Sequence, residues 1–393
     1  MSDTSQRPLN VLALEPYYGG SHSAMLDAWI AKSEHDWTLS TLPPYHWKWR
    51  MRHAAVTFAD RLNKGLNNGE IAWDVVFTCS MLDLATFRGL APPRVAQLPT
   101  VLYFHENQLT YPVRHEEERD LHFGLTNMTS ALAADEVWFN SAFHRDDFLG
   151  ALSQELGRLP KTELGEPVAE ILRRSRIEHP IIHPIAPREG RRKDGPLRIV
   201  WAARWEHDKN PEEFFDALDR LEERGVDFQV SVLGEQFKDV PPIFEIAKKR
   251  LGERILRWGY QSSREEYEDA IRECDVVVST AGHEFFGIAV LEAISAGLFP
   301  LLPDRLAYPE VIAAVESDPT LRSRRLYDGT PEGLADRLAG LAESLAKGYP
   351  SFVDGSGVNR RASRAKELFA AAPRAASMDE RLRQVVTERE GST

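Results

Sequence analysis

Short runs of apolar residues alternate with amphipathic helical stretches along this chain, and the alternation occurs in two separate series. The first series places predicted strands at 10–14, 75–78, 101–104 and 137–140, with helices at 21–31, 121–133 and 142–152. The second places strands at 198–202, 228–233, 255–258, 276–279 and 299–302, with helices at 211–221, 241–251, 264–271 and 288–296. Strands that alternate with helices form parallel sheets covered on both faces. The pattern therefore predicts an α/β protein of two doubly wound, Rossmann-like domains.

A segment rich in proline, glycine and charge separates the two series at 184–196. This composition is typical of a linker, and 393 residues are too many for one ordinary core. We therefore predict an N-terminal domain at 1–185 and a second domain at 196–350. The remainder, 351–393, has a helical pattern and is predicted to pack back toward the N-terminal domain. Ligands of open parallel sheets bind beyond the carboxyl ends of the strands, so we expect the site in a cleft between the domains.

The composition limits the class of function. The chain is 42% hydrophobic and 27% charged, and no apolar run approaches the ~20 residues of a membrane span. The N-terminus lacks the apolar stretch of a secretory signal, and Cys79 and Cys274 have no metal-ligand spacing. These features predict a cytoplasmic protein that does not bind a membrane. The net charge of −12 argues against a broad nucleic-acid surface but leaves room for a local basic groove.

Two glutamates mark a candidate site in the second domain. Glu284 precedes an apolar helix that starts near Gly287, and Glu292 lies inside that helix. The unpaired N–H groups at a helix start favour phosphate. Carboxylates instead accept hydrogen bonds from hydroxyls, which indicates a sugar on one side of a diphosphate and a ribose on the other. The structural alternative is an ordinary helix with an acidic first turn.

Two cations follow the first strand of the second domain. Arg204 and Lys209 stand in a polar segment, and Pro211 opens the next helix at a favoured position. Two positive charges at the carboxyl end of a strand suit a diphosphate leaving group. We expect both side chains to be exposed. The alternative to a binding role is an ordinary solvated surface loop.

The loop 234–237 and the turn 259–260, which contain Gly234 and Tyr260, lie where a nucleobase would bind.

Two glycines and a histidine follow the first strand of the N-terminal domain. Gly19 and Gly20 would let a ligand approach the backbone closely, and Ser21 is a candidate cap for the next helix. A plain structural turn is the alternative. The chain contains neither the G-x-G-x-x-G fingerprint of dinucleotide reductases nor the G-x-x-x-x-G-K-[ST] motif of P-loop NTPases.

Four polar residues follow the strand at 101–104 of the same domain. They are His105, Glu106, Asn107 and Gln108. A histidine in this place could hydrogen-bond an acceptor hydroxyl or the sugar. The alternative is a hydrogen-bonded structural turn, because buried polar groups usually find partners.

Aromatic and basic residues alternate in the segment 46–53. Trp47 and Trp49 are interleaved with Lys48, Arg50 and Arg52. Aromatic faces stack on unpaired bases while Lys and Arg contact phosphates, which predicts an RNA contact. The alternative is a helix whose tryptophans belong to the core and whose basic residues form the wet face.

Several of these motifs together resemble a known family. The pair Arg204 and Lys209, followed by Glu284 and Glu292 in an E-x₇-E spacing, resembles the donor domain of retaining GT-B glycosyltransferases. The segments EPYYGGSH (15–22), WKWRMR (47–52), HENQLTYP (105–112) and FNS (139–141) resemble the tRNA-queuosine α-mannosyltransferase family. That resemblance implies an enzyme that moves mannose from GDP-mannose to the cyclopentenediol of queuosine in tRNA. It also implies guanine as the base, no metal, and no cofactor apart from the nucleotide-sugar substrate.

The resemblance also implies roles for single residues. In it, Arg204 and Lys209 hold the diphosphate, Glu284 contacts the sugar hydroxyls and Glu292 the ribose. From its own place after a buried strand, we also predict that His105 lines the reaction centre. We assign to the donor Gly19, Gly20, Arg204, Lys209, Gly234, Tyr260, Glu284, Phe285, Phe286, Gly287 and Glu292. We assign to the acceptor His22, Trp47, Lys48, Trp49, Arg50, Arg52, Glu106, Asn107 and Gln108. Two alternatives remain open: a GT-B enzyme with a small-molecule, lipid or saccharide acceptor, and a non-catalytic RNA- or sugar-binding module.

Overall fold

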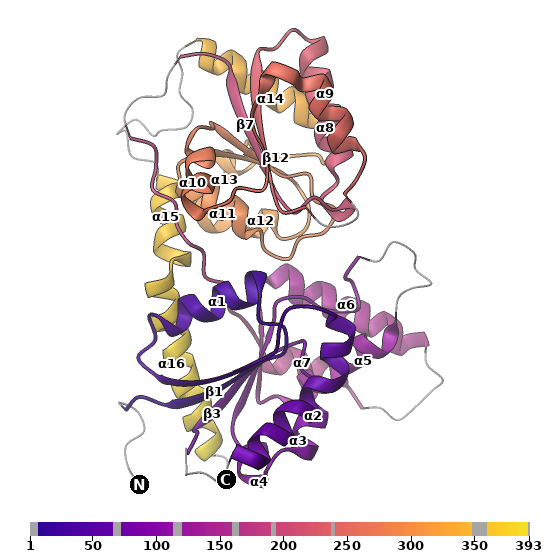
Figure 1. Cartoon of the computed structure of the whole chain (residues 1–393), viewed down its shortest axis with the longest axis vertical. Coiled ribbons are helices and arrows are strands. Elements are labelled where there is room, and N and C mark those ends of the chain that lie inside the picture. Colours follow the sequence, from indigo (N-terminus) through magenta and orange to yellow (C-terminus); the bar gives the residue numbers. More distant parts are fainter. Residues whose placement is uncertain are drawn as a thin grey trace. The chain divides into compact units, whose positions relative to one another are not determined.

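The computed structural model of the chain describes residues 7–65, 72–112, 120–158, 165–189, 194–236, 240–347 and 360–391. It forms two compact units, Met1–Ile181 with Ala371–Thr393, and Ile182–Ala370 (Figure 1). The first boundary lies just before the predicted linker. The C-terminal helices are shared between the units, because α15 (Arg360–Phe369) belongs to the second and α16 (Ala371–Glu390) to the first.

The first unit contains a parallel six-stranded sheet in the order β2-β1-β3-β4-β5-β6. Its strands are β1 (Asn10–Glu15), β2 (Asp36–Thr41), β3 (Val75–Cys79), β4 (Thr100–Phe104), β5 (Glu136–Phe139) and β6 (Ser175–Ile177). Besides α16, its helices are α1 (Gly20–Ile30), α2 (Trp47–Gly65), α3 (Leu84–Leu90), α4 (Pro93–Ala96), α5 (Leu121–Ala133), α6 (Ala142–Arg158) and α7 (Pro167–Arg174). The strand order reverses at β1 and β3, which is where such sheets bind ligands.

Successive residues of the four central strands of the first sheet, β1, β3, β4 and β5, enter opposite cores. Val11 of β1 packs with helices α1 and α16, whereas its neighbour Leu12 packs with α2 and α3. Val101 and Leu102 of β4 divide in the same way. This follows from the period of two along a strand, and it explains why these strands are continuous apolar runs. Figure 1 shows the corresponding helices on either side of the sheet.

The second unit contains another parallel six-stranded sheet, in the order β12-β11-β10-β7-β8-β9. Its strands are β7 (Leu197–Ala202), β8 (Phe228–Leu233), β9 (Ile255–Gly259), β10 (Val276–Val278), β11 (Phe299–Pro303) and β12 (Leu326–Tyr327). Besides α15, its helices are the 3₁₀ turns η3 (His207–Lys209) and η4 (Gly252–Arg254), and α8 (Pro211–Glu223), α9 (Ile243–Leu251), α10 (Arg264–Arg272), α11 (Ile288–Ser295), α12 (Tyr308–Val315), α13 (Pro319–Arg322) and α14 (Pro331–Ala346). The order reverses between β7 and β10, so the loops that follow these two strands meet.

Three strands of the structure were not among those predicted. β2 is an edge strand that pairs with β1 alone among the described residues and has no fully buried position, so it lacks an apolar run. β6 and β12 have three and two residues and are too short for a period to appear. The nine strands that were predicted are all present and parallel, which confirms the doubly wound fold class.

Helix α16 is fastened to the first unit by buried polar contacts. Asp379 is 1% exposed and accepts hydrogen bonds from Trp29 Nε1 at 2.7 Å, Ser33 Oγ at 2.9 Å and the Glu34 N–H at 2.7 Å.

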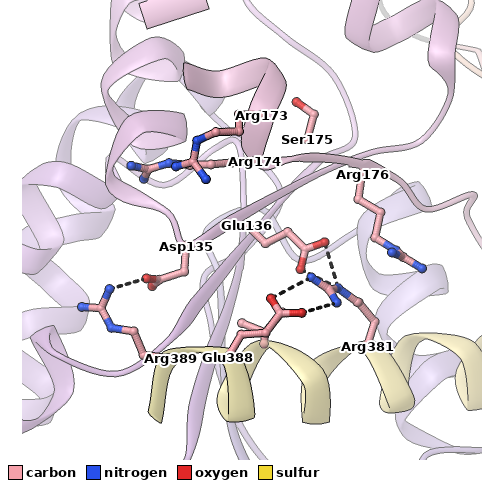
Figure 2. A pocket seen from close by; sticks show the side chains of 10 residues that line it. Asp135, Glu136, Arg173, Arg174, Ser175, Arg176, Arg381, Glu388 and Arg389 are labelled. Atoms are coloured by element: carbon pink, nitrogen blue, oxygen red, sulfur yellow. Dashed lines mark hydrogen bonds and ion pairs between the residues drawn. The ribbon is translucent and has the colours of Figure 1, made fainter. Parts of the chain in front are cut away.

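At the amino ends of β5 and β6, a cavity of about 480 Å³ is lined by arginines and carboxylates (Figure 2). Arg381 of α16 pairs there with Glu136 at 2.8 Å and with Glu388 of its own helix at 2.9 Å.

Candidate active site

The loops after β7 and β10 are joined directly in the second unit. The backbone carbonyl of Asp208 accepts hydrogen bonds from the N–H groups of Gly282 at 2.8 Å and His283 at 3.2 Å. Thr280 Oγ1 donates to the carbonyl of Lys209 at 2.9 Å. This junction brings the predicted cations of the loop after β7 close to Glu284, the first glutamate of the E-x₇-E pair. About 75 residues separate Lys209 from Glu284 along the chain.

Lys209 is the centre of this junction. It lies in η3, is only 7% exposed, and its Nζ donates to the His283 carbonyl at 2.7 Å. Nζ also lies 3.0 Å from Asp208 Oδ2 and 3.4 Å from Glu284 Oε2. Burial acts to lower the pKa of Lys209, but the attraction of Glu284 and Asp208 raises it above its ordinary value. The prediction that both side chains are exposed is therefore wrong for Lys209 and confirmed for Arg204.

Glu284 is held ionised by the same contacts. Burial acts to raise the pKa of its carboxyl, but Lys209 and the N–H of Phe286 lower it below the usual range. Burial and the charge of Lys209 lower the pKa of the neighbouring His283 ring to about 4. Glu284 is therefore charged, whereas His283 is neutral. A carboxylate beside a lysine and a neutral imidazole can accept hydrogen bonds from sugar hydroxyls.

Gly287 caps α11 in a left-handed conformation, with φ 95°. Few residues other than glycine adopt this conformation without strain, and an added Cβ would lie 3.2 Å from the ring of Tyr308. The helix therefore starts at Ile288, as predicted. Phe285 and Phe286 are 5% and 3% exposed, and Phe286 packs in the core on Phe369 at 5.6 Å between ring centroids. Contact of either phenylalanine side chain with the donor stays a prediction.

A cavity of about 470 Å³ opens beside this junction within the second unit. Four residues predicted for the donor line it: Arg204, Gly234, Tyr260 and Glu292. Gly234 has φ 156°, and an added Cβ would come within 1.8 Å of the Ala203 carbonyl, so only glycine fits. Tyr260 is 68% exposed and presents a ring face for stacking. Phe237, at the end of the predicted base-binding loop, lies outside the described residues.

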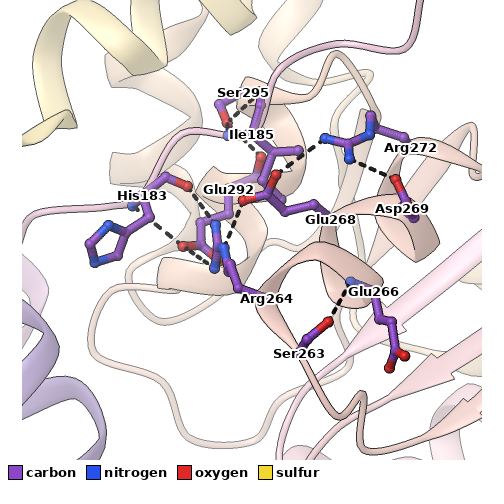
Figure 3. Close-up of polar contacts among 10 residues, drawn as sticks. All are labelled: His183, Ile185, Ser263, Arg264, Glu266, Glu268, Asp269, Arg272, Glu292 and Ser295. Carbon is purple, nitrogen blue, oxygen red and sulfur yellow. Dashed lines mark hydrogen bonds and ion pairs between the residues drawn. The ribbon is translucent and has the colours of Figure 1, made fainter.

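The second glutamate of the pair is enclosed in a polar cluster (Figure 3). Glu292 is 4% exposed, and Nη1 of Arg264 bonds its two carboxylate oxygens at 3.0 and 3.1 Å. Burial raises the pKa of Glu292, although Arg264 acts to lower it. Arg264 and its cavity neighbours Gln261, Ser262, Ser263 and Tyr267 were not predicted from the sequence. Their position directly after β9 was the available signal.

In the first unit, a carboxylate and two histidines meet after β1 and β4. Glu15 is 2% exposed, and its Oε1 lies 3.2 Å from Nδ1 of His22 and accepts hydrogen bonds from Cys79 Sγ at 3.2 Å and the Tyr17 N–H at 2.8 Å. The rings of His22 and His105 stack with centroids 3.9 Å apart. Burial acts to lower the pKa of His22, but Glu15 raises it above the ordinary value.

His105 is thereby kept neutral. Burial, His22 and His144 all lower its pKa well below the usual range. A neutral ring offers one donor and one acceptor nitrogen, which is what a contact to a hydroxyl requires. Glu15, His22 and His105 place potential ligand atoms within 4.8 Å of one another. The stacked rings of His22 and His105 have an interplanar angle of 25°. The lone pairs of nearly parallel rings point side by side instead of toward one point, so this arrangement favours hydrogen bonding over a metal centre.

The residues around His22 and His105 have mainly local partners. Oδ1 of Asn107 accepts hydrogen bonds from the N–H groups of Leu109 and Thr110, both at 3.0 Å, so this side chain builds the turn. Gln108 Nε2 lies 3.4 Å from Glu106 Oε1. Gly19 is required by Pro44, since an added Cβ would lie 2.4 Å from its Cγ. Gly20 starts α1 with φ 55°.

Helix α1 shows one further difference from the sequence analysis. Gly19 is its N-cap residue, and no side chain caps the helix. The prediction that Ser21 caps it is therefore wrong.

The aromatic and basic residues at 47–52 form the first turns of α2. Trp49 is 68% exposed, and Lys48 and Arg52 are exposed as well. Trp47 instead packs on Phe123, at 5.2 Å between ring centroids. Arg50 lies over the ring of Tyr45 at 4.6 Å. The segment is thus divided, with Trp47 partly buried against a core cluster and Trp49 in solvent.

Comparison with known proteins agrees with these features. Residues 10–182 match the family model described as tRNA-queuosine alpha-mannosyltransferase N-terminal, and residues 184–347 match glycosyl transferases group 1. A tRNA-queuosine alpha-mannosyltransferase of Drosophila melanogaster is 37% identical over 313 residues, which cover 77% of this chain and 81% of the relative. The chain belongs to the tRNA-queuosine alpha-mannosyltransferase family. This confirms the resemblance seen in the motifs.

Solved structures of similar fold support the architecture of this family member. The Anabaena protein HepE in complex with UDP superposes with a TM-score of 0.64 and 13% identity, over 96% of this chain and 100% of that chain. Sucrose-phosphate synthase from Thermosynechococcus elongatus has a TM-score of 0.65 and 14% identity, over 97% and 100%. The fold is thus GT-B. Within the described ranges, every helix is too short or too polar to cross a bilayer.

Proposed function

We propose that this protein transfers mannose from GDP-mannose to the cyclopentenediol of queuosine in tRNA, with retention of the anomeric configuration. The observation that carries the proposal is the cavity of the second unit, which Arg204 and Glu292 line. The charge of Arg204 also acts on Lys209, which pairs with Glu284 at 3.4 Å. Cations flanked by carboxylates match a diphosphate flanked by two groups that carry hydroxyls. Membership of the family supports the same activity.

Each group has a place in the proposed reaction. The charges of Arg204 and Lys209, with the amino end of α11, would stabilise the negative charge that develops on the leaving diphosphate. Glu284 would orient the mannose through its hydroxyls, and Glu292 the ribose. His105 would hydrogen-bond the acceptor hydroxyl or the sugar as a neutral ring. None of these roles needs a metal ion, so we propose catalysis that persists in EDTA.

The choice of GDP-mannose is supported by a second group of relatives. Two Mycobacterium tuberculosis proteins named GDP-mannose-dependent alpha-(1-6)-phosphatidylinositol dimannoside mannosyltransferase are 27% identical to this chain over 139 residues, 35% of its length and 34% of theirs. In the proposed complex, Tyr260 would stack on the guanine, because its exposed ring lines the cavity.

The proposed acceptor is an RNA loop, and the first turns of α2 suit one. Trp49 offers a stacking face, and the neighbouring Lys48 offers positive charge to phosphates on a protein that is acidic overall. Arg52 is exposed but pairs with Asp120 at 3.0 Å, so a phosphate would have to compete with that carboxylate. A tRNA substrate would place the activity in the cytoplasm. The anticodon loop of tRNA presents unpaired bases in this way.

Transfer to defined tRNA would test the proposal. The protein is incubated with GDP-mannose and tRNA that contains queuosine, the tRNA is digested, and mannosylated queuosine is measured by mass spectrometry. We expect product with this tRNA, none with the same tRNA lacking queuosine, and much less with UDP-glucose as donor. Release of GDP with a saccharide but not with tRNA would establish the small-acceptor alternative, and binding of both substrates without transfer would establish the non-catalytic one.

A further inference from the structure

The carboxylate of Glu292 has a dedicated partner that neither the motifs nor the comparisons assign. Arg264, the first residue of α10, reaches Glu292 on α11 with one nitrogen, Nη1, between its two oxygens (Figure 3). The backbone N–H of His183 donates to Oε1 of the same carboxylate at 3.3 Å. Arg264 and Glu292 both line the 470 Å³ cavity.

Arg264 is itself held in place on two sides. Its Nη2 donates to the carbonyl of His183 at 2.8 Å, and its Nε donates to Glu268 Oε1 at 2.9 Å. The side chain is 43% exposed, but all three of its nitrogens are engaged. A guanidinium fixed by three partners restricts the rotation of the carboxylate that it contacts.

The charge of this arrangement matters for a diol ligand. A ribose presents two neighbouring O–H donors, and an ionised carboxylate can accept both, whereas a protonated one keeps fewer acceptor sites. Burial favours the protonated form of Glu292, and Arg264 opposes it. The other titratable groups facing Glu292 are the Tyr267 hydroxyl and the His183 ring, with Glu268 beyond Arg264. Arg264 is the cation in this set that pairs with the carboxylate.

We propose that Arg264 is a positioning residue for the donor, which holds the Glu292 carboxylate in the orientation that accepts the two ribose hydroxyls of a nucleoside diphosphate. The inference rests on the proposed function, because it assumes that the cavity binds the donor nucleotide. It goes beyond that function in assigning the ribose selectivity of the site to a contact between α10 and α11.

The test compares the binding of GDP and 2′,3′-dideoxy-GDP by calorimetry. The wild-type protein should prefer GDP by about tenfold or more, the usual contribution of hydrogen bonds to a charged group. Arg264→Gln should lose most of this preference by weakening GDP alone, and Arg264→Lys should keep part of it. Because burial raises the pKa of Glu292 and Arg264 opposes it, GDP binding by Arg264→Gln should increase as the pH rises above about 7, and the wild-type protein should change less. His183 has a lowered pKa and stays neutral over this range.

Arg272→Gln is the matched control. Arg272 lies on the same helix and pairs with Glu268 and Asp269 but makes no contact with Glu292 among the described hydrogen bonds. It should keep the wild-type preference for GDP. If Glu292→Gln abolishes the preference while Arg264→Gln and Arg264→Lys retain it, the role of Arg264 is overturned and the proposed donor site stands. If Glu292→Gln also retains it, the assignment of the ribose to Glu292 fails first. Should Arg264→Gln not fold, the same comparison on Arg264→Lys decides.

Discussion

The two predicted diphosphate-binding cations differ in burial, so their removal should affect the stability of the fold differently. Lys209 and Arg204 were both predicted to bind diphosphate, yet Lys209 is buried against two carboxylates and Arg204 is exposed. Arg204→Ala should therefore slow transfer with a change in unfolding free energy below about 1 kcal/mol. Lys209→Ala should slow transfer and also cost about 3 kcal/mol, because it removes a buried cation from two partly buried carboxylates. Chemical denaturation of both variants measures the difference, and equal stability would contradict the buried pair.

The two glutamates of the E-x₇-E pair should be separable by kinetics. Glu284→Gln should lower the rate of transfer while GDP binds nearly as before, because Glu284 is assigned to the sugar. Glu292→Gln should weaken GDP binding and transfer together, since a neutral amide accepts fewer hydrogen bonds from the ribose. GDP affinity by calorimetry and turnover by product formation are compared for each variant. A loss of GDP affinity in Glu284→Gln alone would exchange the two roles.

The pair of Glu15 and His22 should make stability depend on pH in a defined direction. Glu15 raises the pKa of folded His22 above its unfolded value of 6.5, so the stabilisation is complete below that pH and is lost as the pH rises through the raised folded value. Glu15→Gln should thus cost about 1.5–3 kcal/mol near pH 6 and less near pH 9. Denaturant midpoints at the two pH values measure this, and a cost that grows with pH would contradict the assignment.

Helix α2 has one exposed face and one face buried in the core. Its first turns present Trp49 and Lys48 to solvent, while Met51, Ala54, Ala55 and Phe58 enter the core. Trp49→Ala should weaken tRNA binding by about 1–3 kcal/mol, the usual contribution of one stacked base. Lys48→Glu should also flatten the dependence of binding on salt, because a phosphate contact is lost.

Lys64→Glu is the matched control for this helix, since Lys64 lies at the other end of α2 and is likewise exposed. Filter binding of tRNA over a salt series should show little change for this variant. Equal loss of binding in Lys48→Glu and Lys64→Glu would show a general effect of charge instead of a local contact.

Across the whole chain, the last helix completes a unit that begins some 370 residues earlier. Asp379 satisfies three donors of the segment 29–34 in a position that is 1% exposed. Asp379→Ala leaves the buried Trp29 Nε1 and the partly buried donors of Ser33 and Glu34 without this partner, and it should destabilise the first unit by about 2–4 kcal/mol. In calorimetry, the transition of the first unit should move to lower temperature while that of the second stays in place. Movement of both transitions by the same amount would contradict the division of the chain at Ile182 and Ala370.

Much of this architecture could be predicted because it depends on neighbouring residues. Strands buried on both faces are visible as continuous apolar runs such as Val75–Cys79, and helices as longer amphipathic periods. Gly287 could be placed at the start of α11 because glycine tolerates a positive φ. An edge strand such as β2 escaped prediction, since pairing on one side leaves its residues half-exposed and without a distinctive period.

The site required contacts between distant segments, which no local pattern encodes. The pairing of β7 with β10 brings Asp208 to the backbone of Gly282, and this long-range contact adds Glu284 to the partners of Lys209 beside its sequence neighbour Asp208. Likewise, Arg264 and Glu292 stand 28 residues apart and meet because α10 and α11 pack in the same core. Residue types and spacing therefore indicate which groups this chain offers to a nucleotide sugar. Burial and long-range packing establish which of them are charged, which are held in place and by what, because both depend on neighbours that are remote along the chain.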